Sequence, residues 1–261
     1  MATQLTEQQI REGLERLGPF HHNVDLPHGL STHDESQKRR SIELTRVSSL
    51  VDHAFPPLLR AVGGSLAGKR VLDVACNCGG FSVAATQHGC ESVMGVDIVD
   101  HYVEQANFIK DAAGLDNAEF KVLDVNDISE STVGMFDVTL CFGLMYHLEN
   151  PVLSMKRIAS VTKEHMLIDT AVLPTPKGNP KFMSKPLWMM NFPTVAGDDK
   201  HHTTSGWRAD ERPIQFAPTV NAVIELMKNL GFSRVEKIEP TNPDIETRYY
   251  KGRRASFLAS R

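Results

Sequence analysis

A short apolar run that ends in a glycine pair constrains the fold of this chain more than any other feature. Residues 70–75 are rich in valine and leucine, as expected of a strand that is buried on both faces of a parallel sheet. Gly79 and Gly80 follow and supply the backbone freedom of a tight turn into a helix, predicted at residues 80–88. Such a turn lets a ligand approach the backbone and the first N–H groups of the helix.

A second apolar run, residues 92–96, ends at an acidic residue. The carboxylate of this residue, Asp97, is placed to accept hydrogen bonds from the two hydroxyls of a ribose. The loop after the first run carries Asn77, lacks the G-x-G-x-x-G spacing that suits a pyrophosphate, and is faced by Asp73. Because a carboxylate repels a pyrophosphate but pairs with an α-amino group, a nucleoside that bears an amino acid, such as S-adenosylmethionine, fits better than NAD.

Apolar runs and helical stretches alternate through most of the chain, which is typical of βαβ units. The pattern predicts an α/β fold, namely a doubly wound, Rossmann-like, mostly parallel seven-stranded sheet with its ligand over the C-terminal ends of the strands. The strands are expected near residues 70–75, 92–97, 118–123, 136–142, 165–171, 232–239 and 248–259. The helices are expected near residues 6–17, 37–61 with a break at Pro56-Pro57, 80–88, 99–113, 151–161 and 219–230. Thr6 and Gln9 are expected to form a capping box at the start of the first helix.

Two of these segments carry a family resemblance that covers about residues 67–172. The run from Val71 to Ser82 resembles motif I of the class I S-adenosylmethionine-dependent methyltransferases. The run from Phe136 to Pro151 resembles the fourth-strand motif of the branch that includes the tRNA wobble-uridine carboxymethyl- and methyltransferases and their small-molecule relatives. The resemblance implies bound S-adenosylmethionine, released as S-adenosylhomocysteine. The residues that it and the loop pattern assign to the cofactor are Asp73, Ala75, Asn77, Gly79, Gly80, Asp97, Ile98, Asp124, Val125 and Phe142.

The chain is predicted to hold one domain with two additions. Residues 1–66 form a helical N-terminal arm, and residues 67–261 form the methyltransferase domain. Within that domain, residues 173–216 interrupt the alternation of strands and helices and contain both tryptophans, Trp188 and Trp207. A long insertion of this kind builds a substrate wall, a dimer contact, or both.

A histidine-rich loop, residues 20–33, lies between the two helices of the arm. We expect it to cover the cofactor or to touch the substrate, with His21 and His22 as candidate substrate contacts. A metal site is the alternative, but the irregular order of the histidines favours a polar lid without metal. The four cysteines are expected to be buried and reduced rather than paired in disulfides or bound to a metal.

The charge of the chain favours a small-molecule substrate over a polynucleotide. The formal net charge is −4, and the basic footprint that nucleic-acid binding normally needs is limited to residues 38–40 and the final strand. In that strand Arg254 is a candidate for holding an anionic substrate group, and a solvated surface is the alternative. No apolar run approaches the roughly 20 residues that span a bilayer, and no signal segment is evident at the start, so a cytoplasmic enzyme is expected.

The expected function is methylation of a small molecule by S-adenosylmethionine, with oxygen as the favoured acceptor atom. Methyl transfer to oxygen requires alignment of the acceptor and removal of its proton. His147 follows the fourth predicted strand and is the candidate general base, while Tyr146 is the candidate to orient the acceptor. A structural role for His147 is the alternative. The reserve candidates for the base are His21, His22, His201 and His202.

Two further functions stay open. The first is methylation of tRNA wobble uridine, which the narrower resemblance suggests. Members that use a carboxylated cofactor carry a basic residue before a Gly-Pro-Phe-like turn, whereas Leu17 precedes Gly18-Pro19-Phe20 here, which counts against such a cofactor. The second is a protein that binds the cofactor but has lost catalysis, because a fold alone does not guarantee chemistry.

Overall fold

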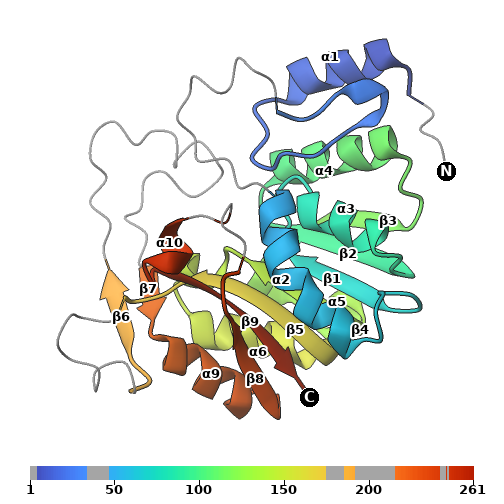
Figure 1. Cartoon of the computed structure of the whole chain (residues 1–261). Coiled ribbons are helices and arrows are strands. Elements are labelled where there is room, and N and C mark those ends of the chain that lie inside the picture. Colours follow the sequence, from blue (N-terminus) through green and yellow to red (C-terminus); the bar gives the residue numbers. More distant parts are fainter. Residues whose placement is uncertain (1–4, 34–46, 175–184, 192–214, 242–244, 246) are drawn as a thin grey trace. The chain divides into compact units, whose positions relative to one another are not determined.

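Figure 1 shows the computed structural model, in which the chain divides into two compact units, residues 1–124 and residues 125–261. The residues that the structure describes are 5–33, 47–174, 185–191, 215–241, 245 and 247–261.

The first unit contains three parallel strands in the order β3-β2-β1. They are β1 (Arg70–Val74), β2 (Ser92–Asp97) and β3 (Ala118–Val122). Helix α3 (Gly80–Gln87) follows β1, and helix α4 (Asp100–Ala113) follows β2. These bounds agree with the predicted ones to within two residues, because apolar strands that are buried on both faces are easily recognised in a sequence.

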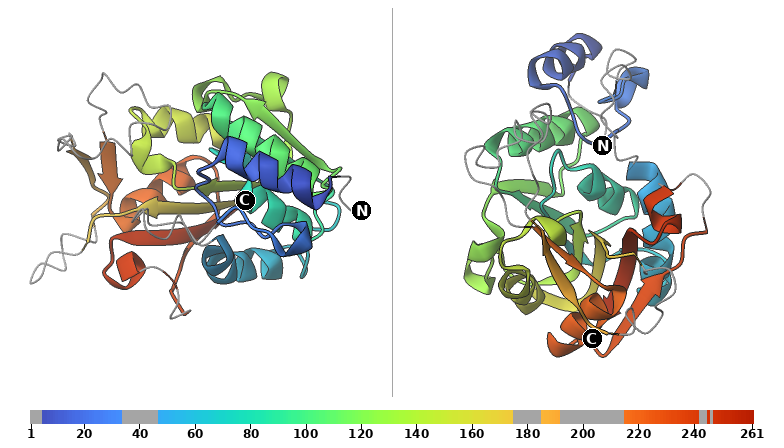
Figure 2. Two further views of the ribbon diagram at one scale, coloured as in Figure 1. Left: turned by 90° about the horizontal axis from the view of Figure 1, so that it is seen from above. Right: turned by 90° about the vertical axis from the view of Figure 1, so that its left-hand side faces the viewer.

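The arm joins this unit through helix α1 (Glu7–Leu17), which runs along α4 (Figures 1 and 2). Helix α1 begins at the predicted capping box, since the Thr6 hydroxyl oxygen accepts the Gln9 N–H at 3.3 Å and the Thr6 N–H donates to Gln9 Oε1 at 2.8 Å. Buried apolar side chains of the arm, among them Ile10 and Leu17, pack with Ile109 of α4. The boundary predicted after residue 66 stays a prediction.

Helix α2 (Val47–Ala61) also belongs to the first unit, and the break predicted at Pro56-Pro57 is wrong. A proline removes the hydrogen bond to the carbonyl four residues earlier. The helix continues through both prolines. Pro56 and the residue four positions before it, Asp52, are both exposed, so the carbonyl that Pro56 leaves without its helical partner can be hydrated.

The second unit contributes four strands of the larger sheet, in the order β4-β5-β9-β8, of which β4 and β5 are parallel and the last two are antiparallel to their neighbours. The strands are β4 (Phe136–Phe142), β5 (Thr162–Ala171), β8 (Arg234–Ile238) and β9 (Arg254–Ser260). The helices are η3 (Val125–Asp127), α5 (Glu130–Val133), η4 (Met145–His147), α6 (Pro151–Ser160), α9 (Val220–Asn229) and α10 (Thr247–Tyr250).

Two predictions for the second unit need correction. The last strand begins at Arg254 rather than at residue 248, because residues 247–250 form the short helix α10. The segment predicted as an irregular insertion contains a strand, β6 (Trp188–Asn191), which pairs antiparallel with β7 (Gln215–Pro218). Backbone pairing across more than twenty intervening residues leaves no periodic signal in the sequence.

The predicted fold class is confirmed. Seven strands, mostly parallel, alternate with helices in the α/β, Rossmann-like manner. In the described part of the chain, no helix has the length and apolar character needed to cross a membrane.

Candidate cofactor loop and polar cluster

Asp73 is a buried carboxylate in β1, with 1% of its surface exposed. Its Oδ2 accepts a hydrogen bond from the Ser82 hydroxyl of α3 at 2.7 Å. Burial raises the pKa of Asp73 to about 7, although the Ser82 hydrogen bond lowers it, and the charge on Asp97 adds to the rise. A cationic group beside Asp73 would offset the cost of burying its charge, so this position suits an amino group.

Asp97 ends β2 and is held by the backbone on both carboxylate oxygens. Oδ2 accepts the N–H of Asn77 at 2.9 Å, and Oδ1 accepts the N–H of Val99 at 3.0 Å. Burial raises the pKa of Asp97, and these backbone hydrogen bonds oppose the rise. Because a carboxylate oxygen accepts more than one hydrogen bond, both atoms can still receive hydroxyl donors.

The apolar side chain of Ile98 directly follows this carboxylate and is 57% exposed. An exposed apolar surface beside a pair of acceptors for hydroxyl groups suits a base attached to a ribose. Together with the buried Asp73, these groups fit the predicted nucleoside that bears an amino acid.

The loop between β1 and α3 has a strained backbone. Ala75 and Asn77 have φ angles of 56° and 49°, in the left-handed region that non-glycine residues rarely adopt, and Gly79 has a φ of 81°. The Cys78 N–H donates to Asn77 Oδ1 at 2.8 Å, and the Gly79 N–H donates to the Cys76 carbonyl at 2.8 Å. Such strain persists only where surrounding contacts hold it, and it is found most often at functional sites.

The sequence predicts that the turn at the glycine pair leaves the first N–H groups of the helix to a ligand, and for Gly80 this needs correction. The Gly80 N–H is not left for a ligand, because it donates to Nδ1 of His22 at 3.2 Å. A Cβ on Gly80 would lie 2.8 Å from the same atom, and a Cβ on Gly79 would lie 2.9 Å from the Phe120 ring. The chain's own side chains therefore require both glycines, and contacts of Gly79 and Gly80 with the cofactor stay predictions.

The remaining predicted cofactor residues lie at the ends of strands or directly after them. Asp124 follows β3 and is half-buried, as is Val125 at the start of η3. Phe142 ends β4 with 7% of its surface exposed. Their role at the cofactor stays a prediction.

A buried polar cluster surrounds Asp169 in β5, which is 0% exposed. Its Oδ1 accepts from Nε of Arg254 at 2.6 Å and lies 2.5 Å from Nη2 of the same residue. Its Oδ2 accepts from the hydroxyls of Tyr249 and of Ser256, the latter at 2.7 Å. The sequence analysis missed Asp169, Tyr249 and Ser256. An aspartate inside the apolar run of residues 165–171 is the signal that was available, because a buried charge requires partners.

Arg254 itself was predicted as a substrate contact and is 9% exposed rather than part of a solvated surface. Burial opposes its charge, but the Asp169 carboxylate, with smaller contributions from Tyr146 and Tyr249, raises the pKa of Arg254 above its ordinary value. Asp169 thus fixes the position of a permanently charged guanidinium.

Tyr146 and His147 lie in η4, directly after β4. Their rings are in contact in a tilted arrangement, with centroids 4.1 Å apart. Gly143, with a φ of 74°, leads the chain into this turn, and its N–H donates to the Asp169 carbonyl at 2.9 Å. A Cβ on Gly143 would lie 3.6 Å from Oη of Tyr146 and 3.8 Å from Nη2 of Arg254, so both groups lie around this glycine.

The predicted substrate contacts of the arm belong to the first unit, whereas those of the insertion belong to the second unit. His21 is exposed, and His22 is 6% exposed and held against Gly80. Trp188 is half-buried in β6. Trp207, His201 and His202 lie outside the described residues. All four cysteines are buried, and none of them forms a disulfide bond.

Comparison with known families and sequences gives the following matches. A family model described as "Methyltransferase domain" matches residues 65–204. A ubiquinone biosynthesis O-methyltransferase of Acinetobacter baylyi is 25% identical over 131 residues, which are 50% of this chain and 51% of that protein. A tRNA U34 carboxymethyltransferase of Helicobacter acinonychis is 31% identical over 117 residues, 43% of this chain and 44% of that protein. The chain thus spans about half the length of these curated relatives.

Solved structures share the fold. The N-terminal domain of EvdMO1 with SAH bound has a TM-score of 0.68 and 17% identity, covering 98% of this chain and 96% of that one. Magnesium protoporphyrin IX methyltransferase from Synechocystis PCC 6803 with bound SAH has a TM-score of 0.55 and 17% identity, covering 96% and 94%.

Proposed function

Because the chain belongs to the methyltransferase-domain family of S-adenosylmethionine-dependent enzymes, we propose that it methylates a small molecule on an oxygen atom. The observation that carries the choice of substrate is the buried Arg254 guanidinium, which Asp169 holds in place near the Tyr146 hydroxyl. A buried guanidinium that a carboxylate holds in place suits one oxygen-bearing group of a small acceptor, such as a carboxylate. Phosphates of a polynucleotide instead require a row of accessible cations.

The described surface supports this choice. Several of its exposed cations are paired with acidic side chains rather than gathered into a basic stripe. The pairs are Lys163–Asp137, Lys228–Glu225, Arg234–Glu236 and Lys237–Glu239.

In the proposed cofactor site, Asp97 accepts the two ribose hydroxyls, Ile98 packs on the adenine with Asp124 and Val125 nearby, and Asp73 pairs with the amino group. When bound, S-adenosylmethionine supplies a methyl group that is activated by the positive charge on sulfur. Asp73 and Asp97 fix the bound molecule at its two ends, so the loop contributes positioning rather than proton transfer.

On the acceptor side, we assign proton removal to His147 and orientation of the acceptor to its neighbour Tyr146. A neutral imidazole has an ordinary pKa near 6.5, which suits acceptance of a hydroxyl proton near neutral pH. Arg254 uses Nε and Nη2 for Asp169, and within the described residues no hydrogen bond is recorded for Nη1. The Nη1 donors are proposed to hold the acceptor, with His21, Trp188 and Trp207 as further proposed substrate contacts. His22 is left out of this set, because its buried ring accepts the Gly80 N–H.

The test is methyl transfer from labelled S-adenosylmethionine to two pools, a small-metabolite extract and total tRNA. We expect label in the small-molecule pool, in a product whose new methyl group is bonded to oxygen. Label in tRNA alone would contradict the proposal and favour the second candidate. Label in neither pool, with cofactor bound, would identify a protein that has lost catalysis.

Methylation of tRNA wobble uridine is the second candidate, and the similarity to the tRNA U34 carboxymethyltransferase favours it. If this candidate is correct, tRNA binding should weaken steeply as salt is added. Absence of tRNA binding at low salt would rule it out. A homodimer and a cytoplasmic location stay predictions from the sequence.

A further inference from the structure

His22 stands out among the histidines of the arm because its ring is buried against the cofactor loop. It is 6% exposed, and its ring meets that of Phe81 edge to face at a centroid distance of 5.2 Å. Nδ1 accepts the Gly80 N–H, so the hydrogen of the neutral ring lies on Nε2. Burial lowers the pKa of His22 to about 3, with a smaller effect from His21, so Nδ1 is an acceptor throughout the neutral range.

The arm fixes the position of this ring through its own backbone. The Thr32 hydroxyl donates to the His22 carbonyl at 2.6 Å and accepts the Val24 N–H at 2.8 Å. The Thr32 N–H donates back to the Val24 carbonyl at 3.0 Å. Residues 22–32 therefore form a closed, cross-linked turn that presents the imidazole in one orientation.

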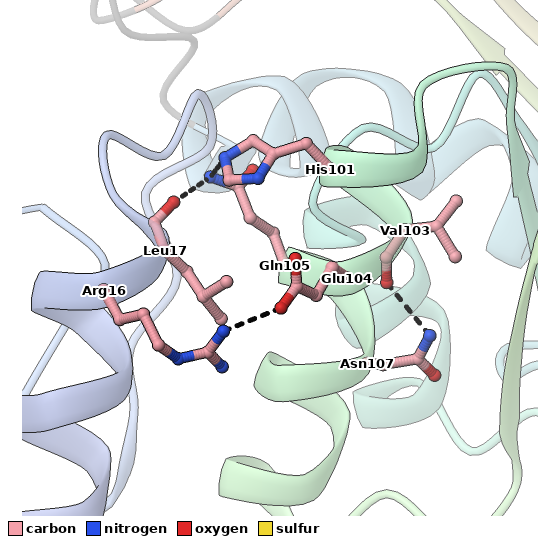
Figure 3. A network of polar contacts seen from close by, with 7 residues as sticks. All are labelled: Arg16, Leu17, His101, Val103, Glu104, Gln105 and Asn107. Carbon is pink, nitrogen blue, oxygen red and sulfur yellow. Dashed lines mark hydrogen bonds and ion pairs between the residues drawn. The ribbon is translucent and has the colours of Figure 1, made fainter.

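The arm is also fastened to helix α4 by the residues that directly precede its histidine-rich loop. Figure 3 shows the Gln105 amide at the Leu17 carbonyl and the ion pair between Arg16 and Glu104. Gln105 Nε2 lies 2.7 Å from the Leu17 carbonyl oxygen and 3.0 Å from that of Pro19. The buried side chains of the arm also enclose the loop residue Cys78. These side chains are Ile10, Leu17, Phe20, Val24 and Leu26.

The cofactor loop between β1 and α3 needs such support because its backbone conformation is strained. Ala75 and Asn77 both have positive φ angles, and the hydrogen bonds that hold them come from the loop itself and from Asp97. The bond from Gly80 to His22 comes from outside the loop and β2 and fixes the point at which the loop enters α3. Removing the acceptor would leave a buried N–H without a partner, which favours a shifted loop.

We propose that His22 is a positioning residue of the cofactor site, which holds the loop in its binding shape through the Gly80 N–H, so that the N-terminal arm sets the affinity for the cofactor. This inference rests on the cofactor site of the proposed function. It is independent of the methyl acceptor.

The test is calorimetric titration of S-adenosylhomocysteine into the full-length wild type and three variants. His22→Phe fills the ring space without an acceptor, whereas His22→Asn places an amide oxygen close to the position of Nδ1. We expect His22→Phe to bind roughly ten-fold more weakly, from the loss of one buried hydrogen bond, and His22→Asn to stay within about three-fold of wild type. Asn23→Ala alters the exposed neighbour and is expected to bind as the wild type does.

Equal affinity of His22→Phe and wild type would overturn the inference, and so would equal losses in His22→Phe and His22→Asn, which would indicate packing alone. A wild type that binds no S-adenosylhomocysteine would overturn the proposed function and this inference with it. Hydrogen exchange of the Gly80 amide in the liganded wild type needs no variant. We expect strong protection, and exchange as fast as in an exposed amide would overturn the inference.

Discussion

In the first unit, the buried carboxylates of Asp73 and Asp97 receive hydrogen bonds from neutral groups alone among the described residues, namely a hydroxyl and backbone N–H groups. In the second unit, Asp169 is more deeply buried but is bound by the guanidinium of Arg254. Burial consequently raises the pKa of Asp73 and of Asp97, whereas the charges of the Asp169 cluster compensate each other. Among the described residues, Asp73 and Asp97 have no cationic partner, and a ligand can supply one. Asp169 already has a cationic partner in Arg254.

Substitution of His147 should have the largest effect, and it should lower turnover without changing the affinity for the cofactor. In His147→Asn, loss of the general base should reduce kcat by roughly 10²–10⁴-fold. Affinity for S-adenosylhomocysteine should not change, since the cofactor carboxylates are untouched. Comparing the rate of methyl transfer with calorimetric affinity checks this, and an unchanged kcat would leave His147 only a structural role.

The completeness of the Asp169 cluster predicts a large loss of stability when one partner is removed. Asp169→Asn leaves the Arg254 guanidinium buried without its counter-charge, which should cost about 3–5 kcal/mol in the free energy of unfolding. The double variant Asp169→Asn with Arg254→Met should recover much of this loss. Urea unfolding measures both, and a loss below about 1 kcal/mol for the single variant would show that the pair is not compensated as described.

Asp97→Asn tests whether the first arrangement serves a ligand rather than the fold. Its side chain keeps one carbonyl acceptor but loses the charge-assisted pair of acceptors for the ribose hydroxyls, so affinity for S-adenosylhomocysteine should fall by roughly 100-fold. Asp137→Asn, which alters a carboxylate of the second unit that is paired with Lys163, is the matched control. Equal affinity of Asp97→Asn and wild type would contradict the assignment.

The raised pKa of Asp73 leads us to expect a pH dependence of cofactor binding. Since its pKa in the free protein is about 7, the carboxylate is mostly protonated at pH 6 and mostly ionised at pH 8. Only the ionised form pairs with the cationic amino group, so affinity should rise roughly ten-fold from pH 6 to pH 8 and then level off. Asp73→Asn should bind more weakly and lose this dependence. A pH-independent affinity in the wild type would indicate that Asp73 does not face the amino group.

Substitution of Gln105 should have the smallest effect, because it removes neutral hydrogen bonds alone. In Gln105→Leu, the carbonyls of Leu17 and Pro19 lose their donor, and the unfolding free energy should fall by about 1 kcal/mol. Gln8→Leu, on the exposed face of α1, is the control for urea unfolding. If the unfolding free energy fell as much as in Asp169→Asn, the expected difference between buried neutral groups and buried charged groups would be contradicted.

The sequence was most informative where a local pattern determines the structure. The apolar run before Gly79, the acid at Asp97 and the capping box at Thr6 each depend on neighbouring residues, and each was found where it was expected. By contrast, the partner of Asp169 is 85 residues away at Arg254, and a single sequence does not reveal side-chain pairing over that separation. Only the aspartate itself, inside an apolar strand, gave a signal.

The glycine pair shows the same limit on a smaller scale. The turn at Gly79 and Gly80 was predicted correctly, but the group that occupies the Gly80 N–H comes from His22, 58 residues earlier. The loop pattern and the histidine-rich segment were each recognised, and their contact depends on the packing of the arm. The backbone position of a site is therefore easier to predict than the identity of the groups that complete it.

The most direct test of the account is calorimetric titration of the wild type at pH 8 with S-adenosylhomocysteine and, separately, with NAD. The two carboxylates that lack a cation should accept a nucleoside with a cationic amino acid and reject a pyrophosphate. We predict one bound S-adenosylhomocysteine per chain and no binding of NAD. Binding of NAD with equal or higher affinity, or binding of neither molecule, would contradict the account.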